Sequence, residues 1–163
     1  YVAVGTQGEL DAAVAGRKVV GGVAMDTDVS IADVMRASLA RIRGNDRGFF
    51  MMAECTATDR AGHGNSPSKA VCAVTQVEFM AQAAVDFAQE HDDTLVVVTA
   101  DHETGGAFVV RGADGQMTVD YMTTSHTSMP VPVYAYGPGA ERFEGLIDNT
   151  DIARNIAFLL KLP

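Results

Sequence analysis

Carboxylates and histidines follow two apolar runs of the sequence, in the loops that come after residues 48–53 and 95–98. Neighbouring carboxylate and imidazole groups are side chains that a zinc ion binds. In open α/β sheets, ligands bind just beyond the carboxyl ends of the strands. The sequence therefore predicts one shared metal site, of a catalytic rather than a structural kind. Its candidate residues are Glu54, Asp59, His63, Asp101, His102 and His126.

Taken singly, each of these residues is more often a turn residue, a helix cap or a surface histidine than a ligand. Their occurrence together in loops after predicted strands favours a site. The fourth histidine, His91, is not a candidate, because it ends a predicted long helix. At that position a cation complements the helix dipole.

The composition is that of a folded protein with an acidic surface. The 163 residues carry a formal net charge of −9, and 47% of them are hydrophobic, which is ample for the core of one domain. No cluster of Lys and Arg occurs, so neither a nucleic acid nor an anionic membrane is an expected partner. No apolar run approaches the roughly 20 residues of a membrane span. The two cysteines support neither a disulfide framework nor a zinc ribbon.

The elements that must position the candidate residues alternate between helix and strand, which predicts an α/β fold. Strands are expected at residues 18–24, 48–53, 94–100 and 131–136, and a hairpin over 109–119. Helices are expected at residues 6–14, 30–43 and 67–90, and a final helix is expected to be capped by residues 149–151. Residues 48–100 would then form a right-handed crossover between parallel strands. Helix 67–90 would bury an apolar stripe of Ala70, Val74, Val77, Ala81, Ala84 and Ala88.

Taken in order, these motifs resemble the C-terminal part of an alkaline phosphatase. The matching stretches are residues 48–54 with Asp59 and His63, residues 94–106, residues 125–127, residues 131–139 and residues 148–152. A single Asp-His pair would be a weak signal, but the ordered set spans essentially the whole chain. The resemblance implies a layered α/β/α fold with a mostly parallel central sheet that is incomplete on its N-terminal side. Residues 1–163 would be a single domain, with residues 107–125 as a short hairpin insertion.

The resemblance also implies two zinc ions and one magnesium ion as cofactors. It assigns Asp59, His63 and His126 to the first zinc, Asp101 and His102 to the second zinc, and Glu54 to the magnesium. Three protein ligands leave one position of a zinc ion open for phosphate or water. Two metals about 3.5–4 Å apart can stabilise the attacking and leaving oxygens of an in-line displacement. Arg60, directly after Asp59, is a candidate phosphate contact.

The chain departs from the family pattern in several respects. It lacks the serine nucleophile in its Asp-Ser-Ala context, an Asp that bridges the second zinc and the magnesium, and the phosphate-binding Arg, all of which belong to the N-terminal half of the family fold. Cys55 stands where the family usually has Gly, and Met80 where it commonly has Asp. Because Tyr1 is not a usual start, we expect a truncated chain whose partner is the N-terminal half of the same protein.

The expected function is metal-dependent hydrolysis of phosphate monoesters by the full-length protein, through a phosphoserine whose serine is not in this chain. The chain alone is therefore expected to be inactive. Two alternatives stay open: another member of the superfamily, such as a phosphodiesterase, sulfatase or phosphomutase, and a zinc-binding fragment without catalysis. The family resemblance also implies a periplasmic or extracellular location and a homodimer.

Overall fold

The structure, a computed structural model, describes residues 2–4, 19–21 and 30–162. Within these ranges the strands form four two-stranded sheets. Strand β1 (Val2–Val4) pairs in parallel with β2 (Val19–Gly21), which agrees with the strand expected at residues 18–24 over the part that is described. The helix expected at residues 6–14 lies outside the described residues.

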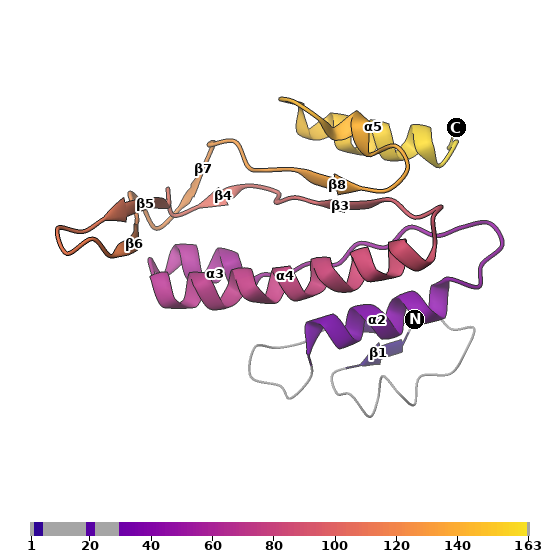
Figure 1. Ribbon diagram of the computed structural model, residues 1–163, viewed down its shortest axis with the longest axis horizontal. Helices are drawn as coiled ribbons and strands as arrows, with labels where there is room; N and C mark the ends of the chain where they lie inside the picture. The colour runs from indigo at the N-terminus through magenta and orange to yellow at the C-terminus, as the bar shows by residue number, and fades with distance from the viewer. Residues whose placement is uncertain (1, 5–18, 22–29, 163) are drawn as a thin grey trace.

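Three helices form the lower part of the molecule in Figure 1: α2 (Ile31–Ile42), α3 (Ala57–His63) and α4 (Pro67–Glu90). Helices α2 and α3 both pack against α4. The bounds of α4 are those predicted, because Pro67 occupies the first helical turn, where its missing N–H costs nothing. Helix α2 also agrees with its prediction, and its expected apolar face includes the buried Leu39.

The other three strand pairs are antiparallel. Strand β3 (Val96–Val98) pairs with β8 (Tyr134–Tyr136), and β4 (Glu103–Thr104) pairs with β7 (His126–Thr127). In Figure 1 these two pairs follow one another as a band that lies between α5 (Asn149–Leu159) and α4. The predicted hairpin is β5 (Phe108–Arg111) with β6 (Met117–Asp120), at one end of the molecule. A short 3-10 helix, η1 (Ala140–Phe143), precedes α5.

The strand expected at residues 48–53 is not formed, so the prediction of a parallel crossover over residues 48–100 is wrong for the described part of the chain. A strand exists only with a neighbour to accept and donate its backbone hydrogen bonds, and no described strand pairs with this segment. Phe49 packs edge-on against Phe87 of α4, with ring centroids 6.0 Å apart. By contrast, Phe50 is 63% exposed and Met52 is 83% exposed.

The single, mostly parallel sheet that the resemblance implied is therefore absent from the described residues. What remains confirmed is the α/β character of the chain. The strands at 94–100 and 131–136 are present but shorter than expected, as β3 and β8. They run antiparallel to each other, which the alternation of helices and strands did not predict.

The core of the described residues is built largely from alanine. Of nine buried apolar residues, six are alanines, and the others are Leu39, Met80 and Phe143. The stripe expected on α4 is confirmed only in part: Ala88 is buried and Ala70, Val77, Ala81 and Ala84 are partly buried, but Val74 is 60% exposed. The other buried positions are Ala73, Met80 and Ala83. Apolar residues occur nearly all round this helix, so spacing alone did not select the buried face. Small side chains let α2 and α3 approach α4 closely.

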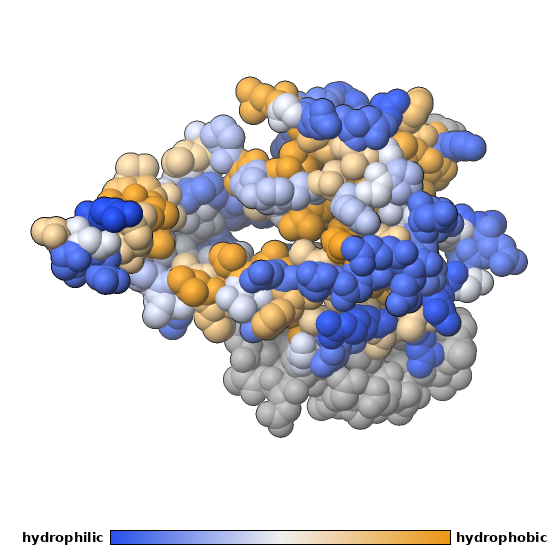
Figure 2. Space-filling model, viewed as in Figure 1, coloured by the Kyte–Doolittle hydropathy of each residue, from blue (hydrophilic) through white to orange (hydrophobic). Residues whose placement is uncertain are grey.

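Apolar side chains are also exposed at the hairpin end, which Figure 2 shows as orange surface at the far left. Phe108, Val109 and Met117 are 42%, 63% and 58% exposed there. At the other end of the chain, α5 begins with a capping box between Asp148 and Asp151. The helix was expected to be capped by residues 149–151, so its cap lies one residue earlier.

Candidate metal centre

Helix α3 carries the first two of the candidate ligands. Asp59 and His63 are four residues apart, so they lie on the same face of the helix, one turn from each other. The Nε2 atom of His63 is 3.4 Å from Oδ1 of Asp59. The spacing in the sequence is therefore sufficient to bring this pair together.

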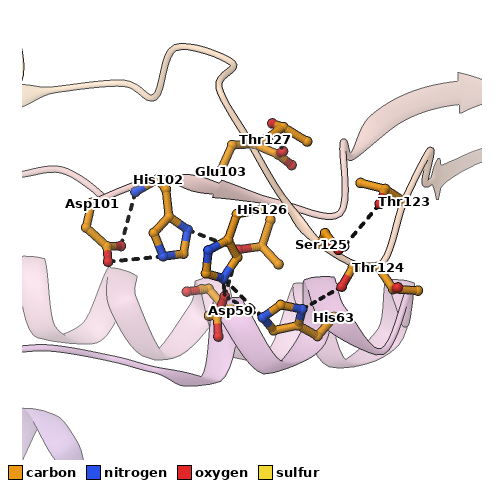
Figure 3. Close-up of polar contacts among 12 residues, drawn as sticks. Asp59, His63, Asp101, His102, Glu103, Thr123, Thr124, Ser125, His126 and Thr127 are labelled. Carbon is orange, nitrogen blue, oxygen red and sulfur yellow. Dashed lines mark hydrogen bonds and ion pairs between the residues drawn. The ribbon is translucent and has the colours of Figure 1, made fainter.

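His126 reaches the same point from β7. Its Nε2 atom lies 3.1 Å from Nε2 of His63 and 3.3 Å from Oδ1 of Asp59. The three ligand atoms thus form a nearly equilateral triangle (Figure 3), and they are the one such group of three among the described residues. The pairing of β7 with β4 and the contact of β4 with α3 bring together residues more than 60 positions apart.

The ring of His63 is oriented by the backbone. Its Nδ1 atom donates a hydrogen bond to the carbonyl oxygen of Thr124 at 2.6 Å. Because a carbonyl can only accept, the proton of a neutral imidazole must be on Nδ1. The Nε2 atom of His63 is then left with a free lone pair, which points at Asp59 and His126.

The carboxylate of Asp59 is held in its ionised form. Thr104 donates a hydrogen bond to Oδ1 of Asp59 at 2.7 Å. This bond lowers the pKa of Asp59, and the three nearby histidines lower it further, while partial burial opposes the shift. The side chain is therefore an anionic oxygen donor at neutral pH.

The second candidate pair lies next to the first group. Nε2 of His102 is 3.1 Å from Oδ2 of Asp101, and the ring of His102 stacks on that of His126 with centroids 3.6 Å apart. Asp101 has an 83% exposed side chain, whereas that of His102 is 29% exposed. No third carboxylate or histidine completes this pair among the described residues.

Two other candidates stand apart from the cluster. Glu54 is exposed, and its side chain makes no hydrogen bond or ion pair within the described part of the chain. The side chain of Arg60 is likewise exposed and without such a partner among the described residues. His91, set aside in the sequence, lies at the end of α4, where it stacks on Phe87 and bonds to its carbonyl oxygen.

Glu103 holds the backbone around the site in place, as a residue of the turn rather than a ligand. Its carboxylate accepts hydrogen bonds from the backbone N–H groups of Gly106 and Ala107, at 3.0 and 2.9 Å, and from the hydroxyl of Thr127. Burial raises the pKa of Glu103, but these bonds outweigh it and lower the pKa below the usual value. The carboxylate thereby ties the turn after β4 to β7, next to His126.

The sequence indicates Thr104 as a residue beside the ligands, but it gives no signal for Thr124. Thr104 comes two residues after His102, so an extended backbone places both side chains on one face. The contribution of Thr124 comes from its carbonyl oxygen, which every residue has, so no residue type could have identified it.

A family model described as alkaline phosphatase matches residues 23–118 and 110–162 of the chain. The chain belongs to the alkaline phosphatase family. Alkaline phosphatase 4 of Bacillus subtilis (strain 168) is 30% identical over 203 aligned positions, which cover 81% of this chain and 44% of that protein. The chain thus spans less than half the length of this curated relative.

Solved structures of alkaline phosphatases share the fold. The alkaline phosphatase of the Antarctic bacterium TAB5 is 27% identical and superposes with a TM-score of 0.81, over 90% of this chain and 47% of that one. A histidine-to-aspartate mutant of the TAB5 enzyme, solved with magnesium bound, gives a TM-score of 0.76 over 90% of this chain and 48% of that one, also at 27% identity. No helix in the described part of the chain is long and apolar enough to cross a membrane.

Proposed function

We propose that this chain supplies one zinc site, and part of a second metal site, to an alkaline phosphatase that hydrolyses phosphate monoesters. The observation that carries the proposal is the spacing of the ligand atoms of Asp59, His63 and His126. These atoms are 3.1, 3.3 and 3.4 Å apart. Ligand atoms about 2.0–2.1 Å from a tetrahedral zinc lie about 3.3 Å from one another.

The donor types support the same conclusion. With the Nδ1 proton of His63 bonded to a carbonyl, its Nε2 lone pair faces a carboxylate oxygen and a second imidazole nitrogen. Electron-rich atoms this close repel one another unless a cation or a proton lies between them. Octahedral magnesium, with ligands at about 2.0–2.1 Å, would bring neighbouring ligand atoms to about 2.9 Å and prefers oxygen. Two imidazoles and one carboxylate with these spacings favour zinc.

Asp101 and His102 would bind the second zinc, and Glu54 the magnesium. When bound, two zinc ions supply Lewis-acid stabilisation to the attacking and leaving oxygens of an in-line displacement. The residues of this chain hold the ligand atoms and leave one side of the cluster open to solvent, because the side chains of His63 and His126 are 43% and 48% exposed. Arg60, beside Asp59 and exposed, would contact the phosphate of the substrate.

The rest of the proposal concerns the whole protein. The serine nucleophile, the remaining metal ligands and the strands of a mostly parallel central sheet would come from the N-terminal half of the family fold. Exposed apolar residues such as Phe50 and Met52 would then be covered by that sheet. A single domain over residues 1–163, with a hairpin insertion at 107–125, belongs to this proposal. A homodimer in the periplasm or outside the cell rests on the family resemblance alone.

The test is zinc content by elemental analysis of the dialysed protein, with p-nitrophenyl phosphate turnover assayed on the same sample. We expect about one tightly held zinc in this chain. His126→Ala should lose this zinc, and His91→Ala should retain it. Turnover is expected only in the full-length protein. His91→Ala is a matched control because this histidine lies outside the cluster. No zinc in the unaltered protein would refute the proposal. Zinc without turnover in the intact protein would instead favour a non-catalytic zinc-binding domain.

A further inference from the structure

The hydroxyl of Thr104 touches both groups of candidate ligands. Its Oγ1 atom is 2.7 Å from Oδ1 of Asp59 and 3.3 Å from Nδ1 of His102. Asp59 belongs to the triangle with His63 and His126, whereas His102 belongs to the pair with Asp101. Thr104 is therefore the one side chain in the described residues that is hydrogen-bonded to both groups.

The direction of these two hydrogen bonds follows from the chemistry of the partners. A threonine hydroxyl has one proton to donate and two lone pairs that accept. The ionised carboxylate of Asp59 can only accept, so the proton of Thr104 goes to Asp59. The bond to His102 must then run the other way, from Nδ1–H of His102 to Oγ1 of Thr104.

This direction decides which nitrogen of His102 can bind a metal. A neutral imidazole has one N–H, and a proton held on Nδ1 leaves the lone pair on Nε2. That lone pair faces Oδ2 of Asp101 at 3.1 Å, an arrangement that is favourable when a metal cation lies between the two atoms. Without Thr104, the favourable arrangement is the opposite one, with an Nε2–H donating to Asp101. The lone pair would then be on Nδ1, away from Asp101.

The fold brings Thr104 close enough to α3 by placing a glycine opposite it. A Cβ atom on Gly62 would lie 2.6 Å from the carbonyl oxygen of Thr104 and 2.9 Å from its Cβ. Any larger residue at this position would push β4 away from α3. The contact between Thr104 and Asp59 thus depends on a close approach that only glycine permits.

We propose that Thr104 is a positioning residue that links the two ligand groups: it fixes the carboxylate of Asp59 and holds His102 with its Nε2 lone pair available to a metal. This inference rests on the proposed zinc sites and names a residue that prepares them. It predicts that removing one hydroxyl weakens both groups at once, although Thr104 itself touches no metal.

The experiment uses the intact protein and compares Thr104→Val, which keeps the shape without the hydroxyl, with Thr104→Ser, which keeps the hydroxyl. Thr118→Val is the matched control, because Thr118 lies exposed on β6 of the hairpin. Long-range 1H–15N correlation spectra of the zinc-loaded proteins report which nitrogen of His102 carries the proton. Competition with a chromophoric chelator measures the affinity for zinc.

We expect the proton of His102 on Nδ1 in the unaltered protein and in Thr104→Ser, and on Nε2 in Thr104→Val. Zinc affinity should fall about 10–100-fold in Thr104→Val, the usual cost of losing a partner that orients a ligand, and stay near the original value in Thr104→Ser and Thr118→Val. In a His102→Ala background, Thr104→Val should still weaken zinc binding, through Asp59. No loss in that background would overturn the linking role.

The outcomes separate this inference from the proposed function. If the unaltered protein binds zinc and Thr104→Val binds it equally well with the same His102 proton, the inference about Thr104 is wrong and the zinc site stands. If the unaltered protein binds no zinc, the proposed function fails and the inference about Thr104 fails with it, so the zinc content of the unaltered protein separates the two failures. If Thr104→Val misfolds, Thr104→Ser tests the inference instead. A proton on Nε2 of His102 in Thr104→Ser would refute it.

Discussion

The cluster of Asp59, His63 and His126 and the apolar segment at residues 48–53 differ in how completely this chain builds them. In the cluster, α3 and β7 place three ligand atoms within 3.4 Å of one another, and Thr104 of β4 donates a hydrogen bond to one of them. In the segment, Phe50 and Met52 are mostly exposed, and no described strand pairs with it. A ligand group needs one helical turn and one strand pair, whereas a buried sheet needs neighbours along both edges and both faces.

The largest expected effect comes from breaking the cluster at its shared member. Asp59→Ala removes a carboxylate that lies within 3.4 Å of both histidines, so we expect tight zinc binding in this group to fall at least about 100-fold. Asp101→Ala, which changes the neighbouring pair only, should leave one tightly bound zinc. Chelator competition measures both, and equal losses in the two variants would show that the groups are not separate sites.

A second prediction concerns the close approach of α3 to β4. Gly62→Ala should destabilise the protein by about 1–3 kcal/mol, because the added Cβ would overlap the Thr104 backbone. Gly44→Ala is the control, since a Cβ there meets nothing within 4 Å. Denaturant unfolding measures the free energy of unfolding of both variants. Zinc affinity should fall in Gly62→Ala and stay unchanged in Gly44→Ala. A neutral Gly62→Ala would mean that the contact is looser than described.

A third, smaller effect is expected at α5, which contains no candidate ligand. Hydrogen bonds from the backbone N–H and hydroxyl of Thr150 lower the pKa of Asp148 below its ordinary 3.8, with a further contribution from Arg154. Because the folded pKa is the lower one, Asp148 stabilises the fold above about pH 3.8 and loses this effect as the pH falls through the folded value.

Asp148→Ala should therefore lower the melting midpoint by about 2–4 °C at pH 7. In acid, the difference in melting midpoint between this variant and the unaltered protein should become smaller. Thermal melts between pH 3 and pH 7 measure this. Asp46→Ala, in an exposed turn, provides the comparison and should change the midpoint little at any pH. A difference that widens in acid would contradict the sign derived for Asp148.

The smallest effect is expected at an exposed apolar side chain of α4. Val74 is 60% exposed on α4, so Val74→Ser should change the free energy of unfolding of this chain by less than about 0.5 kcal/mol. Denaturant unfolding of the 163-residue chain measures it. A loss of 2 kcal/mol or more would show that this side chain is buried.

The sequence predicted the features that depend on nearby residues. Pro67 marked the start of α4, the hairpin followed from turn residues between two short apolar runs, and the four-residue spacing of Asp59 and His63 placed both on one helical face. Apart from the meeting of His126 with Asp59 and His63, which the family resemblance implied, it did not predict features that depend on distant partners. The strand expected at 48–53 has no described neighbour, and the buried face of α4 is chosen by α2, α3 and β3 rather than by its own apolar spacing.

The alanine-rich core has a consequence for the energetics of unfolding. Among the described residues, six of the nine buried apolar residues are alanines that expose only one methyl group each when the chain unfolds, and many large apolar side chains are already in contact with water. The heat-capacity increment and the denaturant dependence of unfolding both scale with newly exposed surface. For this chain both should be small for its length, and its calorimetric transition correspondingly broad.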